Sequence, residues 1–111
     1  MGAVGTGAAA KLAQQTMVLV NILSAYEGMS LAERAGIDVD VFQELVKTSA
    51  GQSHIANNWR SFHESTSRNA HMVELFYKGV SPALELAHEV GLSVPGVALA
   101  QQSLVRVFAK P

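Results

Sequence analysis

The chain has 111 residues, of which 49% are hydrophobic, 15% are charged and none is cysteine. This length supports one domain, and the lack of cysteine excludes a disulfide framework, a thiolate metal site and a cysteine nucleophile. Eight basic and nine acidic residues give a net charge of −1, which argues against nucleic-acid binding through a basic patch and against a polybasic membrane anchor. Because the charged fraction is below the usual ~25%, we expect a partner to cover part of the surface.

The start of the chain carries no targeting pattern. A secretory signal needs a basic stretch before its apolar segment, and here Lys11 follows the small residues at positions 1–10. The longest apolar run, residues 17–20, falls far short of the ~20 residues that a membrane-spanning helix needs. We therefore expect a cytoplasmic protein without membrane contact.

The first predicted element is a long helix over residues 7–35, because apolar residues recur three, four or seven positions apart through this stretch. Thr6 is the expected N-cap, and Gly36 is the expected stop. Such a helix is about 43 Å long. Between Met17 and Leu23 it is apolar nearly all round, so we expect its middle to be buried on several sides.

Two shorter helices are predicted next. A connector over residues 37–40 supplies an aspartate cap for a helix over residues 41–48, and a polar break separates this helix from another over residues 55–63. Trp59 and Phe62 are expected to face inward from the latter helix.

The rest of the chain, from residue 64 on, is less regular. Residues 64–69 contain no apolar side chain and predict an exposed, mobile loop, whereas residues 72–77 fit either a strand or a short helix. Pro82 marks the start of a helix that ends at Gly91, and residues 94–96 open a last helix. The predicted fold is therefore all-α, with five or six helices packed around the long first one.

Glycines at the start of the chain form a G-x-x-G-x-G pattern that leads directly into the long helix, at Gly2, Gly5 and Gly7. Glycines allow a ligand to approach the backbone closely, and a helix N-terminus offers free N–H groups to a carboxylate or phosphate. No strand precedes the pattern, so it is not a dinucleotide-binding turn. The alternative is a flexible chain end without a ligand.

Lys11 lies one turn into this helix among alanines, which predicts that its ammonium group is partly desolvated. Desolvation lowers the pKa of a lysine and makes it a candidate general acid or base. Gln15 lies four residues further on, on the same helical face, where its amide could bind the same ligand. The alternative is a surface lysine whose alkyl chain lies along the alanines.

Other polar residues give weaker signals. Lys78 precedes Gly79 at a predicted helix junction, where it could meet an anionic cofactor or simply be solvated. The four histidines share no metal-ligand spacing, and the segment Glu85-x-x-His88 is only half of a di-metal pattern. We therefore expect no metal site and no serine nucleophile.

Residues 2–12 resemble the domain junction of the β-hydroxyacid dehydrogenase family, which includes 3-hydroxyisobutyrate dehydrogenase, tartronate semialdehyde reductase and relatives of 6-phosphogluconate dehydrogenase. The similarity continues through residues 26–38, which hold the Ala/Glu-rich end of the long helix and a Gly-hydrophobic-Asp turn. It reappears at Lys78 and over residues 83–95, so it covers nearly the whole chain.

The resemblance implies an NAD(P)-dependent oxidoreductase that transfers a hydride between a nicotinamide and a small 2- or 3-hydroxy acid. This chain would be its C-terminal substrate and dimerisation domain, with NAD or NADP bound mainly by an N-terminal Rossmann domain that the chain does not include. Lys11 would be the catalytic acid/base, Gly5 and Gly7 would admit the substrate, Gln15 would bind it, and Lys78 would lie near the cofactor. The isolated domain is expected to be inactive.

Three positions depart from the family pattern. Asn normally stands where Gln15 stands, Asp normally follows the second lysine where Gly79 stands, and Phe often occupies the place of His71. These departures argue against hydroxyisobutyrate as the substrate. They also support the alternative function, a non-catalytic helical dimerisation module that keeps the family fold. Both readings predict a homodimer or higher oligomer through the helical domain.

Overall fold

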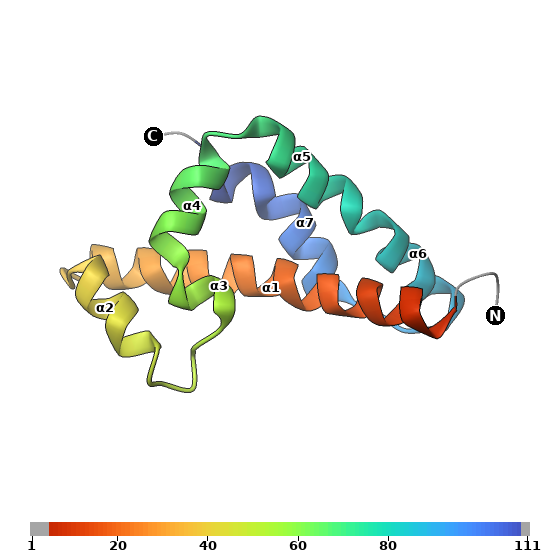
Figure 1. Ribbon diagram of the computed structural model, residues 1–111, viewed down its shortest axis with the longest axis horizontal. Coiled ribbons are helices and arrows are strands. Elements are labelled where there is room, and N and C mark those ends of the chain that lie inside the picture. The colour runs from red at the N-terminus through yellow and green to blue at the C-terminus, as the bar shows by residue number, and fades with distance from the viewer. Residues whose placement is uncertain (1–4, 110–111) are drawn as a thin grey trace.

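Seven helices build residues 5–109, the part of the chain that the computed structural model describes. In chain order they are α1 (Thr6–Arg34), α2 (Val39–Val46), α3 (His54–Asn57), α4 (Trp59–Ser67), α5 (Ala70–Gly79), α6 (Ser81–Glu89) and α7 (Pro95–Val107) (Figure 1). Since α3 and α4 meet at Asn58, they form one broken helix, and the described residues then contain six helices and no strand. The expected all-α fold around one long helix is confirmed. Gly2, the first glycine of the N-terminal pattern, lies outside the described residues.

Glycines end two of the helices, as the sequence predicted. Gly36 follows α1 with φ of +89°, and Gly91 follows α6 with φ of +71°, a backbone region that only glycine enters without strain. The start of α1 differs from the prediction, because Gly5 is its N-cap and Thr6 is already helical. A glycine cap has no side chain that could accept a hydrogen bond from the first turn.

Polar caps set the starts of α2 and α3. The Asp38 carboxylate accepts hydrogen bonds from the backbone N–H groups of Asp40 and Val41, and the Ser53 hydroxyl accepts one from Ala56. The predicted single helix over residues 55–63 is interrupted at Asn58, whose side-chain amide donates to the carbonyl of His54 at 2.9 Å. This local bond ends α3 because it satisfies the backbone outside the helical ladder.

The exposed loop predicted over residues 64–69 is wrong, because α4 continues to Ser67. Thr66 is only 5% exposed, so a β-branched polar residue supplies the contact that the pattern lacked. Glu64 and Arg68 form an ion pair at 2.8 Å across one helical turn, which favours the helix. The ambiguous segment over residues 72–77 lies within α5 and is helical.

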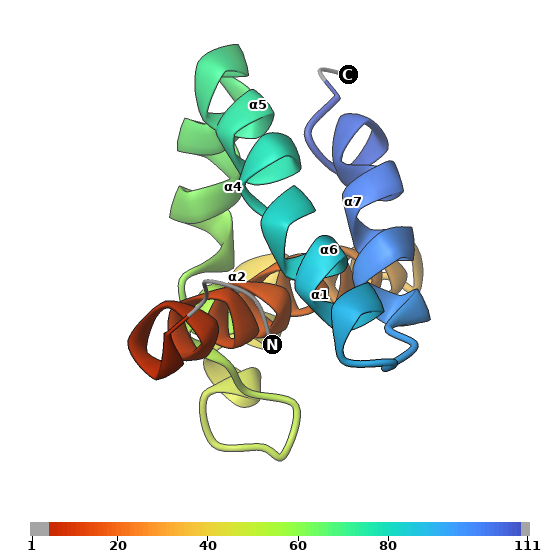
Figure 2. The ribbon, with the colours of Figure 1, turned by 90° about the vertical axis from the view of Figure 1, so that its right-hand side faces the viewer.

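The long helix α1 runs the length of the molecule, and α2, α3, α6 and α7 pack against it (Figure 1). Helices α6 and α7 contact α1 directly, whereas α5 contacts α4, α6 and α7. Figure 2 shows α5, α6 and α7 on one side of α1, and the loop between α2 and α3 on the other. The Cα atoms have a radius of gyration of 15.2 Å.

The core lies between α1, α7 and the broken helix α3–α4. Its most deeply buried side chains are Ile22, Leu104, Val80 and Val107. Trp59 is 6% exposed and contacts the half-buried Phe62 with ring centroids 6.1 Å apart, so both face inward as predicted. The middle of α1 is buried at Leu19, Ile22 and Leu23, whereas Met17 is 66% exposed. No helix within residues 5–109 has the length and apolarity that a membrane crossing requires.

Candidate functional site

The first turn of α1 is an open helix N-terminus. Gly5 has extended backbone angles, makes no side-chain cap, and accepts the first helical hydrogen bond from Ala9 at 2.9 Å. The N–H groups of Thr6, Gly7 and Ala8 precede that bond and have no partner within the helix. The first turn also lacks an acidic side chain. Its partial positive charge is therefore available to an anion.

The two described glycines of this turn are not required by the packing of the domain itself. A Cβ atom placed on Gly5 or Gly7 would have no heavy atom within 4 Å. Glycine inside a helix costs about 1 kcal/mol relative to alanine, so Gly7 weakens the helix without relieving any contact among the described residues. The open space above these positions leaves room for a ligand or another domain.

Lys11 and Gln15 share one face of α1, as predicted, and Gly7, four residues before Lys11, lies on the same face. Lys11 is exposed, and the four ion pairs among the described residues do not include it. The expected desolvation by neighbouring alanines is therefore wrong for this domain alone. The reason is that the first buried side chain of α1 is Leu19, two turns beyond Lys11. Gln15 is half-buried.

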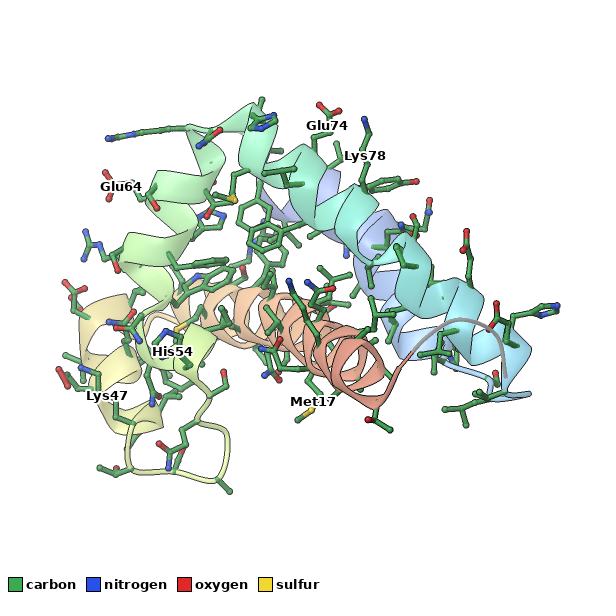
Figure 3. All side chains as sticks on the ribbon, turned by 45° about the vertical axis from the view of Figure 1, so that its right-hand side comes forward. Met17, Lys47, His54, Glu64, Glu74 and Lys78 are labelled. Atoms are coloured by element: carbon green, nitrogen blue, oxygen red, sulfur yellow. The ribbon has the colours of Figure 1, made fainter. Side chains whose placement is uncertain are left out.

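Lys78 lies in the last turn of α5 and forms an ion pair with Glu74, with 2.6 Å between Nζ and Oε1. The hydrogen bond from Lys78, together with its positive charge, lowers the pKa of Glu74. Figure 3 shows both side chains pointing away from α1. The described residues thus bring Gly5, Gly7, Lys11 and Gln15 together at one end of α1, whereas Lys78 stands apart on α5.

The two departures on α5 occupy exposed positions. His71 is in the first turn and exposed, and Gly79 is the last residue of the helix. A Cβ atom on Gly79 would meet no heavy atom within 4 Å, so packing within the domain does not require glycine there either. Within residues 5–109, no three His, Asp or Glu side chains are placed to hold a metal ion.

A cleft of about 390 Å³ at the other end of α1 was not predicted. Its lining includes Glu33, the Asp40–Arg60 ion pair, and His63. The His63 Nε2 atom lies 2.6 Å from the carbonyl oxygen of Val107, and the ring stacks on Trp59 at 5.0 Å. The sequence contains one indication of the contact between Trp59 and His63. The two residues are four positions apart, so on a helix they lie on the same face. The contact between His63 and Val107 joins α4 to α7. The cleft lies roughly 33 Å along α1 from Lys11, at Glu33.

Comparison with known proteins gives a consistent set of relatives. Residues 5–110 match the family described as "NAD-binding of NADP-dependent 3-hydroxyisobutyrate dehydrogenase". The chain is 35% identical over 103 residues to a probable 3-hydroxyisobutyrate dehydrogenase-like 1, mitochondrial, of Arabidopsis thaliana, a match that covers 92% of this chain and 31% of the relative. It is 34% identical over 89 residues to an L-threonate dehydrogenase of Haemophilus influenzae, with 80% and 27% covered.

A shorter match covers part of a third relative. The chain is 39% identical over 51 residues to the mitochondrial 3-hydroxyisobutyrate dehydrogenase of Drosophila melanogaster, which covers 46% of this chain and 16% of the relative. No solved structure matches the chain. The chain thus spans less than a third of the length of the two longer-matching relatives.

Proposed function

This chain belongs to the β-hydroxyacid dehydrogenase family, and on that premise we propose that it is the C-terminal helical domain of an NAD(P)-dependent oxidoreductase. The enzyme would transfer a hydride between a nicotinamide and a small 2- or 3-hydroxy acid. The observation that carries the proposal is the uncapped N-terminus of α1, with two unobstructed glycines and Lys11 one turn further on.

The substrate carboxylate would bind at the first turn of α1. The N–H groups of Thr6, Gly7 and Ala8 can donate to its oxygens, and the helix dipole favours a negative charge there. A side chain at position 7 would take up the space into which the substrate must come. The relatives are named as dehydrogenases of 3-hydroxyisobutyrate and L-threonate, and both compounds carry a carboxylate.

Lys11 would act as the general acid/base. In the oxidation, its neutral amine takes the proton of the substrate hydroxyl while the C–H bond of the same carbon breaks and the carbonyl forms. In the reduction, its ammonium returns that proton to the carbonyl oxygen. The bound nicotinamide supplies the hydride acceptor or donor. A lysine in this role needs to be shielded from water, and because Lys11 is exposed here, the shield must come from outside the described residues.

Gln15 would hold the substrate from the next turn. Its side chain is one methylene longer than the asparagine of the family pattern, so the bound acid would lie further from the backbone of α1 at this position. Lys78 would contact an anionic part of the cofactor, after giving up its surface pairing with Glu74. One exposed lysine fits a single contact with a phosphate. It does not provide a dinucleotide site.

The rest of the cofactor would therefore be held by an N-terminal Rossmann domain, whose glycine-rich turn binds a pyrophosphate. We propose that the enzyme is cytoplasmic and that it forms a homodimer or higher oligomer through the helical domain. The cofactor in this proposal is NAD or NADP. The names of the plant and insect relatives assign those proteins to mitochondria.

The test is turnover of the full-length protein with 3-hydroxyisobutyrate, L-threonate and other small hydroxy acids, followed by the absorbance of NAD(P)H. Lys11→Ala is expected to lower kcat by about 10²- to 10⁴-fold, the usual contribution of a general acid/base, without changing cofactor affinity. Lys47→Ala is the control, because Lys47 is another exposed lysine near the end of a helix. Lys47 differs from Lys11 in that it forms an ion pair, with Glu44. Near-normal turnover of Lys11→Ala would remove the catalytic assignment.

A non-catalytic dimerisation module is the second candidate. The exposed positions of His71 and Gly79, where the family pattern has Phe and Asp, favour it. Titration of the full-length protein with NAD and with NADP separates the two functions. If the protein binds neither cofactor, the dehydrogenase function is excluded and the dimerisation module is the function that the protein retains.

A further inference from the structure

The turn between α5 and α6 carries Lys78 and has few contacts of its own that could orient it. Val80 is both the C-cap of α5 and the N-cap of α6, and no side chain caps α6. Val80 is 2% exposed and anchors the turn in the core, but apolar packing is non-directional and does not set the orientation of the turn. The ion pair with Glu74 holds the end of the Lys78 side chain and leaves the backbone free. The orientation of the turn therefore depends on another element.

Gln101 of α7 supplies a polar contact to this turn. Its Nε2 atom donates to the carbonyl oxygen of Tyr77 at 2.8 Å and to the hydroxyl oxygen of Ser81 at 3.4 Å. Tyr77 lies in the last turn of α5, where backbone carbonyls have no partner within the helix. Helix α7 lies beside α5 (Figure 2). One amide group thus bonds the residue before Lys78 and the first residue of α6.

The packing of α7 does not explain an amide at this position. Gln101 is 7% exposed, and glutamine belongs to the residue types that are mostly found at the surface. An apolar side chain of the same length would fill the space without the cost of burying a polar group. Hydrogen bonds, in contrast, are directional, and both N–H groups of the amide have acceptors here. Gln101 therefore fixes an orientation that apolar packing alone would leave loose.

The neighbouring glutamine makes a different contact with the same residue. Gln102 is exposed, and its Nε2 atom donates to the hydroxyl group of Tyr77 at 3.2 Å. This bond reaches the end of a half-exposed side chain and not the backbone of α5. Gln102 thus contacts Tyr77 without holding the turn that carries Lys78.

We infer that Gln101 is a positioning residue of the proposed site. It holds the turn between α5 and α6 on α7, so that Lys78 meets the anionic cofactor at a fixed place. Gln101 is buried on the α7 side of the turn, whereas the Lys78 side chain is 71% exposed, so Gln101 acts through Lys78 without touching the cofactor. The inference rests on the proposed contact between Lys78 and the cofactor, and it does not depend on the catalytic role of Lys11.

The test is the initial rate of the full-length protein as a function of cofactor and of hydroxy-acid concentration. Gln101→Met keeps the length of the side chain and removes its donors. It should raise the KM for the cofactor by about two- to fivefold, the range of an exposed charge contact, and leave kcat and the KM for the hydroxy acid unchanged. Gln102→Met is the matched control and should change none of the three. Circular dichroism and the thermal midpoint verify that each variant is folded.

A double variant separates positioning from a general effect on the fold. Lys78→Ala should raise the KM for the cofactor, and adding Gln101→Met to it should raise this KM no further, because both substitutions remove the same contact. A further increase in the double variant would overturn the inference, as would an unchanged KM in Gln101→Met where Lys78→Ala raises it. If Lys78→Ala itself has no effect, the proposed cofactor contact is wrong and the inference falls with it.

A shorter amide guards against loss of the fold. If Gln101→Met does not fold, Gln101→Asn takes its place, because it is one methylene shorter and cannot keep the 2.8 Å contact with Tyr77. It should give the same selective rise in the KM for the cofactor. Failure of both variants to fold would make Gln101 a residue of the core alone and would overturn the positioning role.

Discussion

The exposed lysines Lys11 and Lys78 differ in whether they form an ion pair. Lys78 is paired with Glu74 one turn earlier on α5, whereas Lys11 has no carboxylate partner among residues 5–109. A lysine that must meet a ligand is hindered by a fixed carboxylate, because the ligand has to compete with it. Lys11 is thus ready to meet an anionic substrate, and Lys78 becomes available only when its ion pair opens.

Removing that competition should strengthen the cofactor contact. If Lys78 touches a phosphate of NAD(P), Glu74→Gln should lower the KM for the cofactor by about two- to fivefold, in the range of an exposed charge interaction. Because the pKa of Glu74 is lowered by Lys78, the carboxylate stays ionised and competes throughout the neutral range. The measurement is initial rate against cofactor concentration in the full-length protein.

Glu64→Gln serves as the control for this substitution, because Glu64 forms the same four-residue ion pair with Arg68 on a different helix. It should leave the cofactor KM unchanged, while Lys78→Ala should raise it. If Glu74→Gln and Glu64→Gln behave alike, Lys78 does not touch the cofactor and that part of the proposed site is wrong.

At the scale of elements, local signals predicted helix ends better than helix interiors. Gly36 and Gly91 end their helices because left-handed backbone angles are open to glycine whatever lies around it. Residues 64–67 were predicted as loop because they show no apolar period, yet they are helical. Thr66 is buried there by contacts with the rest of the fold, which no local pattern contains. Apolar periodicity therefore misses a helical segment whose buried contact comes from a polar residue.

The N-cap of α2 leads to a prediction about stability. The Asp38 carboxylate accepts two backbone N–H bonds at 2.9 and 3.2 Å in the first turn. Asp38→Ala should lower the free energy of unfolding by about 1 kcal/mol, and Asp38→Asn by much less, since asparagine keeps an acceptor at the same place. Denaturant unfolding at neutral pH measures both. Equal losses for the two variants would show that the charge of Asp38, and not its hydrogen bonds, stabilises the turn.

At the scale of the whole molecule, the site and the core occupy different parts of α1. The shared face of Lys11 and Gln15 was predictable because it follows from helical spacing alone. The contact between the His63 ring and the carbonyl of Val107 was not predictable. It joins residues 44 positions apart and exists only after the chain has folded. The exposure of Lys11 was missed for the same reason, since burial on α1 depends on where α6 and α7 cross it.

Because the core contacts the middle of α1 and the proposed site lies at its start, we expect the first turns of α1 to open more easily than its middle. Residues 5–11 include no buried side chain, whereas Leu19, Ile22 and Met29 are buried in the core. In the full-length protein without ligands, backbone amides of residues 9–14 should exchange with deuterium at least about tenfold faster than those of residues 19–29, since local opening there breaks few contacts. Addition of NAD(P) and a hydroxy acid should slow exchange at residues 9–14 only, because the substrate and the closing domain cover that end of α1. Uniform protection along α1 before ligand addition, or no change after it, would contradict a substrate site at the first turns of the helix.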